Sequence, residues 1–153
     1  MSFTNPFTPN LTDYQTFLTN EGFTAAVLPP DSEWITWSFN RAVTTAKASC
    51  IPGALMSEYV MAVYSLATHH LVLSAQDQPG LSFFANLKAK LNTSGFVGGV
   101  VRGSGDQGTY SEVVVSKLFE NLRITDLEYI KTIWGRMYLS YAQKYGSVVT
   151  VMV

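Results

Sequence analysis

The sequence has one cysteine, few charged residues and no long apolar run. The lone thiol of Cys50 excludes an internal disulfide framework and any zinc site built from several cysteines. We expect it to be a small buried side chain. No stretch of about 18 residues is apolar and uncharged, so no membrane span is predicted. The opening MSFTNPFTPN lacks the basic start and apolar middle of a secretory signal, and we expect residence in a reducing cytoplasm.

Charge is also scarce. Charged side chains make up 14% of the 153 residues, against about 25% in average soluble domains, whereas 47% are hydrophobic. We expect other subunits to cover part of this lean surface. The net charge is -1 and the basic residues are scattered from Arg41 to Lys144, unlike a protein that binds by neutralising phosphates. The length suits a single domain, 1–153.

What the sequence does have is helical periodicity. After an irregular arm at 1–10, a first helix with Thr12 as its cap ends near Asn20 or Glu21. A second helix begins at Asp31 or Ser32. Its predicted buried face holds six apolar residues: Trp34, Ile35, Phe39, Ala42, Val43 and Ala46.

Three further helical patterns follow. Residues 54–75 form the longest and most apolar one, with one acidic and no basic residue, so we expect this helix at the centre of the fold. Residues 81–92 form a weaker helix, apolar at Leu81 and Phe84. Residues 122–146 predict one last helix, in which Gly135 permits a bend or the close approach of a neighbour.

Two segments have a strand-like composition. FVGGVV and TYSEVVV flank a glycine-rich turn, which predicts a β-hairpin or an extended arm at about 96–115, protruding as 95–115. The end of the chain, SVVTVMV at 147–153, is β-branched and uncharged. It either pairs with 108–115 in the same chain or adds to a sheet of another protein. The predicted fold class is thus mainly α: an antiparallel bundle of about four to five helices with this arm and an extended C-terminal strand.

The hexapeptide GSGDQG at 103–108 fits the spacing G-x-G-x-x-G of dinucleotide-binding folds. That fingerprint needs a helix to begin within it and an acidic residue at the end of a second strand. Here a strand-like segment follows, and Asp126 and Glu128 open a helix. We therefore predict a flexible polar turn and no bound phosphate, and no cofactor is predicted.

Catalytic and metal sites have little support. His69 and His70 are the only histidines, and adjacent helical positions diverge by roughly 100°, so one buried and one exposed imidazole are expected. No serine or cysteine is marked as a nucleophile, and no carboxylate pair stands out. The sequence predicts no catalytic, cofactor-binding or metal residue, and an enzyme is disfavoured.

Several stretches together resemble a family of small head-to-tail connector or adaptor proteins of tailed bacteriophages, catalogued as a domain of unknown function. They are LTDYQTFLTNEGFTAAVLPPDSEWITWSFNRA, VYSLATHHLVLSAQD, FVGGVVRGSGDQGTYSEV and KTIWGRMYLSYAQKYG, in the family's order. The resemblance implies a helical-bundle subunit of a dodecameric ring beneath the portal of a DNA-filled capsid, in the virion neck. Double-stranded DNA would pass through the ring without sequence-specific binding, and no membrane would be involved.

The resemblance also implies two contact segments. An extended C-terminal segment would dock on the portal protein, and the glycine-rich arm would contact a neighbouring subunit or the next neck or tail component. The docking residues would be Val148, Val149, Thr150, Val151, Met152 and Val153, and those of the arm Arg102, Gly103, Ser104, Gly105, Asp106, Gln107, Gly108 and Tyr110. The alternatives are another neck or tail-completion protein, or a helical enzyme or binding module for a small ligand.

Overall fold

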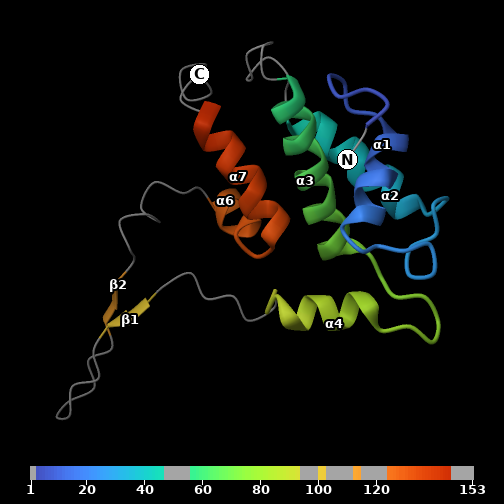
Figure 1. The fold of residues 1–153 in the computed structure, drawn as a ribbon. Helices are drawn as coiled ribbons and strands as arrows, with labels where there is room; N and C mark the ends of the chain where they lie inside the picture. Colours follow the sequence, from blue (N-terminus) through green and yellow to red (C-terminus); the bar gives the residue numbers. More distant parts are fainter. Residues whose placement is uncertain (1–2, 47–55, 94–99, 103–111, 115–123, 146–153) are drawn as a thin grey trace.

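A computed structural model of the chain describes residues 3–46, 56–93, 100–102, 112–114 and 124–145 (Figure 1). The part described is mainly helical, as the sequence predicts. Its elements are α1 Leu11–Asn20, α2 Glu33–Thr45, α3 Met56–Ser74, α4 Phe83–Lys90, β1 Val100–Arg102, β2 Glu112–Val114, α6 Ile124–Tyr129 and α7 Ile133–Tyr145.

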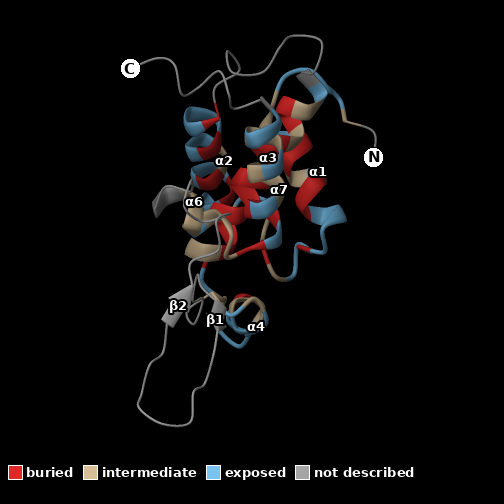
Figure 2. Cartoon of the chain, turned by 90° about the vertical axis from the view of Figure 1, so that its left-hand side faces the viewer, coloured by how far each residue is buried: buried red, intermediate tan, exposed pale blue. Residues whose placement is uncertain are grey.

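Helix α3 lies at the centre, which confirms the prediction for the most apolar segment. Helices α1 and α2 pack on one side of it and α7 on the other, while α4 contacts it near its C-terminal end (Figure 1). Nearly every residue from Tyr59 to Val72 is buried, and the buried faces of the surrounding helices turn toward this core (Figure 2). A helix covered all round can be apolar all round, which explains its composition.

The first helix ends at Asn20 as predicted, but it begins earlier, at Leu11, and its cap is a different residue. Asn10, not Thr12, is the N-cap: its side-chain oxygen accepts a hydrogen bond of 2.8 Å from the amide of Asp13. The prediction failed because both residues are good caps, and the choice depends on how the preceding arm enters the helix. At the other end Gly22 has φ of 95°, and the amide of Phe23 donates to the carbonyl of Leu18 at 2.9 Å.

A buried carboxylate ties the segment before α1 to the fold. Asp13 is only 2% exposed and accepts hydrogen bonds from the amides of Thr4 (2.8 Å) and Asn5 (2.9 Å) and from the side chain of Asn10 (2.7 Å). Desolvation by burial raises its pKa, but these hydrogen bonds to the charged form outweigh that effect and lower the pKa to about 2.

The predicted single helix over 122–146 is wrong, because the chain breaks between α6 and α7. Thr132 explains the break: its hydroxyl oxygen accepts a hydrogen bond of 2.9 Å from the amide of Gly135 and so starts α7 as a cap. The close approach expected at Gly135 is confirmed. A Cβ there would collide with the carbonyl of Tyr129 and lie 2.7 Å from Nδ1 of His69.

The fourth helix is held by a side chain from the preceding turn. Asp77 accepts hydrogen bonds from the amides of Phe84 (2.7 Å) and Ala85 (2.9 Å), two of the orphan donors in the first turn of α4. Phe84 is buried as predicted, whereas Leu81 lies before the helix and is exposed. Strands β1 and β2 pair antiparallel, with Val101 opposite Val113.

Candidate functional site

Most residues that the sequence analysis selected lie outside the described residues. These are Gly103, Ser104, Gly105, Asp106, Gln107, Gly108 and Tyr110 of the arm, Val148 to Val153 of the tail, and Cys50. Arg102 is the last residue of β1, opposite Glu112 of β2. The site that the described residues do show is a surface on α2, which the sequence analysis missed.

The phase of α2 leaves two tryptophans at the surface. Ile35, Ser38 and Ala42 are buried, a spacing of three and four residues that turns one stripe of α2 into the core. Trp34 and Trp37 belong to a neighbouring stripe and are 37% and 44% exposed. The predicted burial of Trp34 and Val43 is therefore wrong. Ser38 faces the core instead, and its hydroxyl donates a hydrogen bond of 3.0 Å to the carbonyl of Ile35.

The exposed rings are ordered by one another and by a cation. Trp34 and Trp37 meet edge to face, with ring centroids 6.4 Å apart. One turn on, the guanidinium carbon of Arg41 lies 5.3 Å from the centroid of Trp37. Aromatic pairs and cation–π contacts of this kind restrict side-chain motion, and so lower the entropy lost when a partner binds. The sequence feature that could have indicated this surface is the spacing of Trp34, Trp37 and Arg41, which places the three residues on one stripe of the helix.

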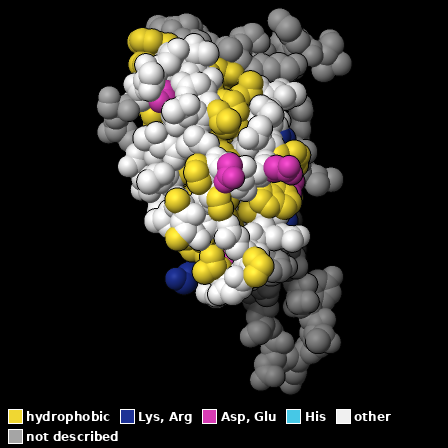
Figure 3. Space-filling view, turned by 90° about the vertical axis from the view of Figure 1, so that its right-hand side faces the viewer, with side chains coloured by type: hydrophobic (Ala, Val, Ile, Leu, Met, Phe, Trp, Pro, Cys, Tyr) yellow, Lys and Arg dark blue, Asp and Glu magenta, His cyan; other side chains and the backbone are white. Residues whose placement is uncertain are grey.

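Two surface hollows adjoin these rings. One, of about 430 Å³, is lined by Ser32, Glu33, Trp34 and Trp37. The other, of about 410 Å³, shares Ser32 and Trp34 and extends over the loop at 27–31 to residues 76–79. Figure 3 looks onto the side of the molecule that carries α1 and α2, where hydrophobic side chains form several patches with acidic side chains among them. We name Asp31, Glu33, Trp34 and Trp37 the α2 surface.

A second apolar side chain is exposed where α7 begins. Ile133 is 51% exposed, whereas Trp134 beside it is buried and donates from its ring nitrogen to Glu21 at 3.0 Å. Arg136 is exposed and Lys131 is partly exposed. We name Lys131, Ile133 and Arg136 the α7 surface. Its neighbouring charges are the cations of Lys131 and Arg136, whereas the α2 surface has the carboxylates of Asp31 and Glu33, with the cation of Arg41 over Trp37.

Both histidines lie in the interior, which corrects the expectation of one buried and one exposed imidazole. His69 is 0% and His70 5% exposed, because α3 is covered on the side of α6 and α7 as well as on the side of α2. Nδ1 of His69 is 2.8 Å from the hydroxyl of Thr132, and both imidazoles contact the ring of Tyr129. The Nε2 atoms of both histidines have no partner among the described residues.

These surroundings keep the imidazoles neutral. Desolvation by burial, with a smaller contribution from the positive charges of His70, Arg41 and Lys131, lowers the pKa of His69 to about 3. Burial and Arg41 lower the pKa of His70 to about 4. In the part of the chain that the structure describes, no three His, Cys, Asp or Glu side chains are grouped to hold a metal ion. The pair packs between α3 and the α6–α7 turn.

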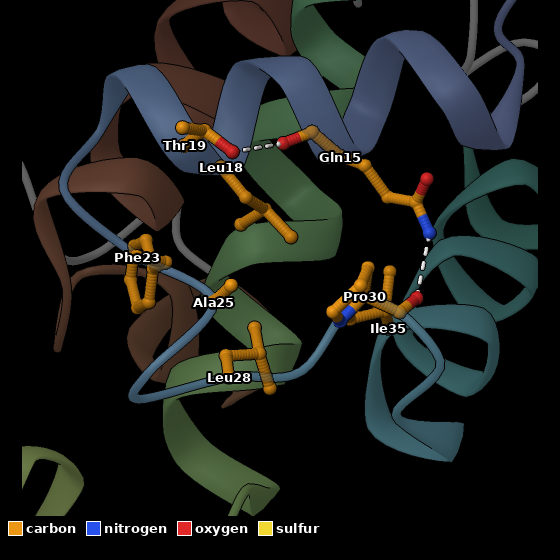
Figure 4. Close-up of a pocket in the computed structure, with 8 residues that line it drawn as sticks. All are labelled: Gln15, Leu18, Thr19, Phe23, Ala25, Leu28, Pro30 and Ile35. Atoms are coloured by element: carbon orange, nitrogen blue, oxygen red, sulfur yellow. Dashed lines mark hydrogen bonds between the residues drawn. The ribbon is translucent and has the colours of Figure 1, made fainter.

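A small hollow between α1 and the start of α2 bears on the small-ligand alternative (Figure 4). Its volume is about 50 Å³, and its lining is mostly apolar: Gln15, Leu18, Thr19, Phe23, Ala25, Leu28, Pro30 and Ile35. Its polar side chains are already engaged, since Gln15 donates to the carbonyl of Pro30 at 2.7 Å and Thr19 to that of Gln15 at 3.0 Å. The hollow lacks the convergent free polar groups of a ligand site.

Comparisons with models of protein families, with curated proteins and with solved structures give no match. Among the described residues, no helix is both long and apolar enough to span a bilayer.

Proposed function

We propose that this chain is a structural subunit of a tailed-phage neck, a head-to-tail adaptor that forms a dodecameric ring on the portal and joins the DNA-filled capsid to the tail. Its helices would form an antiparallel bundle, with the glycine-rich arm at 95–115 and the tail at 147–153 as its two extensions. The protein would be made in the host cytoplasm and reside in the virion. The resemblance of its sequence segments to that family supports the proposal.

The observation that carries the proposal is the exposed tryptophan pair of α2. Trp34 and Trp37 stand at the surface beside hollows of about 430 and 410 Å³. Tryptophan is enriched in the buried centres of protein interfaces, so an exposed pair of tryptophans favours a binding surface. A subunit that functions within an assembly, in contact with other proteins, would account for this surface and for the low charge content of 14%.

The mechanism would be recognition without bond chemistry. Val148 to Val153 would add as a strand to the portal, where main-chain hydrogen bonds supply affinity and alternate side chains supply specificity. The arm, from Arg102 to Tyr110, would contact a neighbouring subunit or the next ring. Contacts repeated around the ring make the assembly stronger than one copy would be.

Deletion of 147–153 tests the docking step. We expect the shortened chain to keep its helical circular dichroism and thermal unfolding, because the described helices pack without that segment. It should fail to bind purified portal rings and to support particles that retain DNA. The full-length protein is the positive control, with the bound mass measured by sedimentation.

Two outcomes would contradict the proposal. Unchanged portal binding by the shortened, folded chain would remove the role of the tail. A full-length protein that stays monomeric with portal rings present would overturn the adaptor function. Binding to tail tubes instead of portals would favour the tail-completion alternative.

A further inference from the structure

Two surfaces of the chain have opposite charges around an exposed apolar centre. On the α2 surface the carboxylates of Asp31 and Glu33 flank Trp34 and Trp37, and all four side chains are exposed. On the α7 surface the cations of Lys131 and Arg136 flank Ile133. The two surfaces are complementary in shape: the α2 surface has a hollow beside its aromatic rings, and the α7 surface has a projecting aliphatic side chain.

We propose that the α2 surface of one subunit binds the α7 surface of the next copy of this chain. The inference rests on the proposed function, since it assigns the contact by which the ring would close. Ile133 would enter the hollow lined by Ser32, Glu33 and Trp34. Arg136 and Lys131 would lie against Glu33 and Asp31, whose charges are opposite to theirs.

Charge distinguishes this contact from a two-fold one. Two α7 surfaces would bring the cations of Lys131 and Arg136 together, and like charges oppose association. A two-fold contact through the α2 surface could place Arg41, the exposed cation beside Trp37, against Glu33 of the other copy. Such a contact would be weakened by charge reversal at Glu33 and unaffected by charge reversal at Arg136.

The position of the two surfaces suits a repeating contact. Helix α2 packs on one side of α3 and α7 on the other, so the two surfaces belong to different helices of the subunit (Figure 1). When two copies join through unlike surfaces, the pair still has one α2 surface and one α7 surface available for further copies. It therefore continues from copy to copy and closes into a ring at the right rotation.

Charge reversal tests the contact without altering the core. Glu33→Lys and Arg136→Glu both change exposed side chains, so each variant should fold as the wild type does. Each alone should weaken self-association at least about tenfold, because it places like charges together. Lys90→Glu, an exposed position on α4, is the matched control and should assemble as the wild type does.

The decisive sample is an equimolar mixture of the two single variants. In the mixture the lysine introduced into one variant would face the glutamate introduced into the other, and the unchanged Glu33 would face the unchanged Arg136, so alternating subunits should assemble again. The double variant in one chain should also recover. Mass distribution by sedimentation or mass photometry, at matched concentration and with portal rings where these are needed for assembly, reads the result.

The outcomes separate this inference from the proposed function. If the wild type assembles but neither reversal weakens it, or the mixture stays dissociated, the contact assigned here is overturned and the adaptor function stands. If the wild type remains a monomer with portal rings present, the proposed function fails, and this inference fails with it. Weakening by each reversal and recovery in the mixture would establish the contact.

Discussion

At the residue scale, the two buried histidines make the free energy of unfolding depend on pH. The pKa is about 3 for His69 and about 4 for His70, against 6.5 for a free imidazole. Unfolded chains would take up protons near pH 6.5 and folded ones only below about pH 4. Acid thus favours unfolding, and the stability present above pH 6.5 is lost as pH falls.

We therefore expect urea unfolding to show a free energy that decreases between about pH 6.5 and pH 4, by up to about 1.4 kcal/mol per pH unit for each histidine. Asp13, whose pKa is lowered from 3.8 to about 2, stabilises the fold above pH 3.8, and that stability is lost only as pH falls toward 2.

His70→Phe provides the matched control for this prediction. Nε2 of His70 has no partner among the described residues, so an aromatic ring without that nitrogen should be tolerated at neutral pH. The variant should lose about half of the dependence on pH, since His69 still titrates. A wild type whose stability is the same at about pH 7.5 and about pH 5 would show that the imidazoles are accessible to protons in the folded state.

At the scale of elements, the start of α1 offers a comparison between two candidate caps. Asn10→Ala removes the acceptor for the amide of Asp13 and should cost about 1 kcal/mol of unfolding free energy. Thr12→Ala, two residues on, changes an exposed side chain that caps nothing and should stay within about 0.5 kcal/mol of the wild type. Thermal or urea unfolding measures both, and equal losses would refute Asn10 as the cap.

The elements also show how far periodicity can be trusted. Apolar spacing correctly predicted α1, α2, α3 and α4, because each buries a stripe or a whole surface against its neighbours. It failed between α6 and α7, where the spacing continues but the Thr132 hydroxyl competes for a backbone amide. A helix interrupted by a side-chain hydrogen bond keeps its apolar pattern, so the pattern cannot reveal the break.

At the scale of the whole molecule, the three tryptophans report on assembly. Trp34 and Trp37 are exposed and Trp134 is 7% exposed, so acrylamide should quench the first two in the free subunit and leave the third largely shielded. In the ring, the proposed contact would shield all three. A variant with Trp34→Phe and Trp37→Phe should show low quenching in either state, and quenching that is unchanged on assembly would place the α2 surface outside the contacts.

The sequence by itself determined the mainly helical fold and the central place of α3, because a helix that is apolar on every side and too short of apolar residues to span a bilayer is buried by its neighbours. It also offered a bend or a close approach at Gly135, and the structure shows the close approach. Only the tertiary structure decided that both histidines are buried and that Trp34 and Trp37 are exposed. Those outcomes depend on which neighbours cover each stripe of a helix, and that covering is made by α1, α2, α6 and α7 together, from segments far apart in the chain.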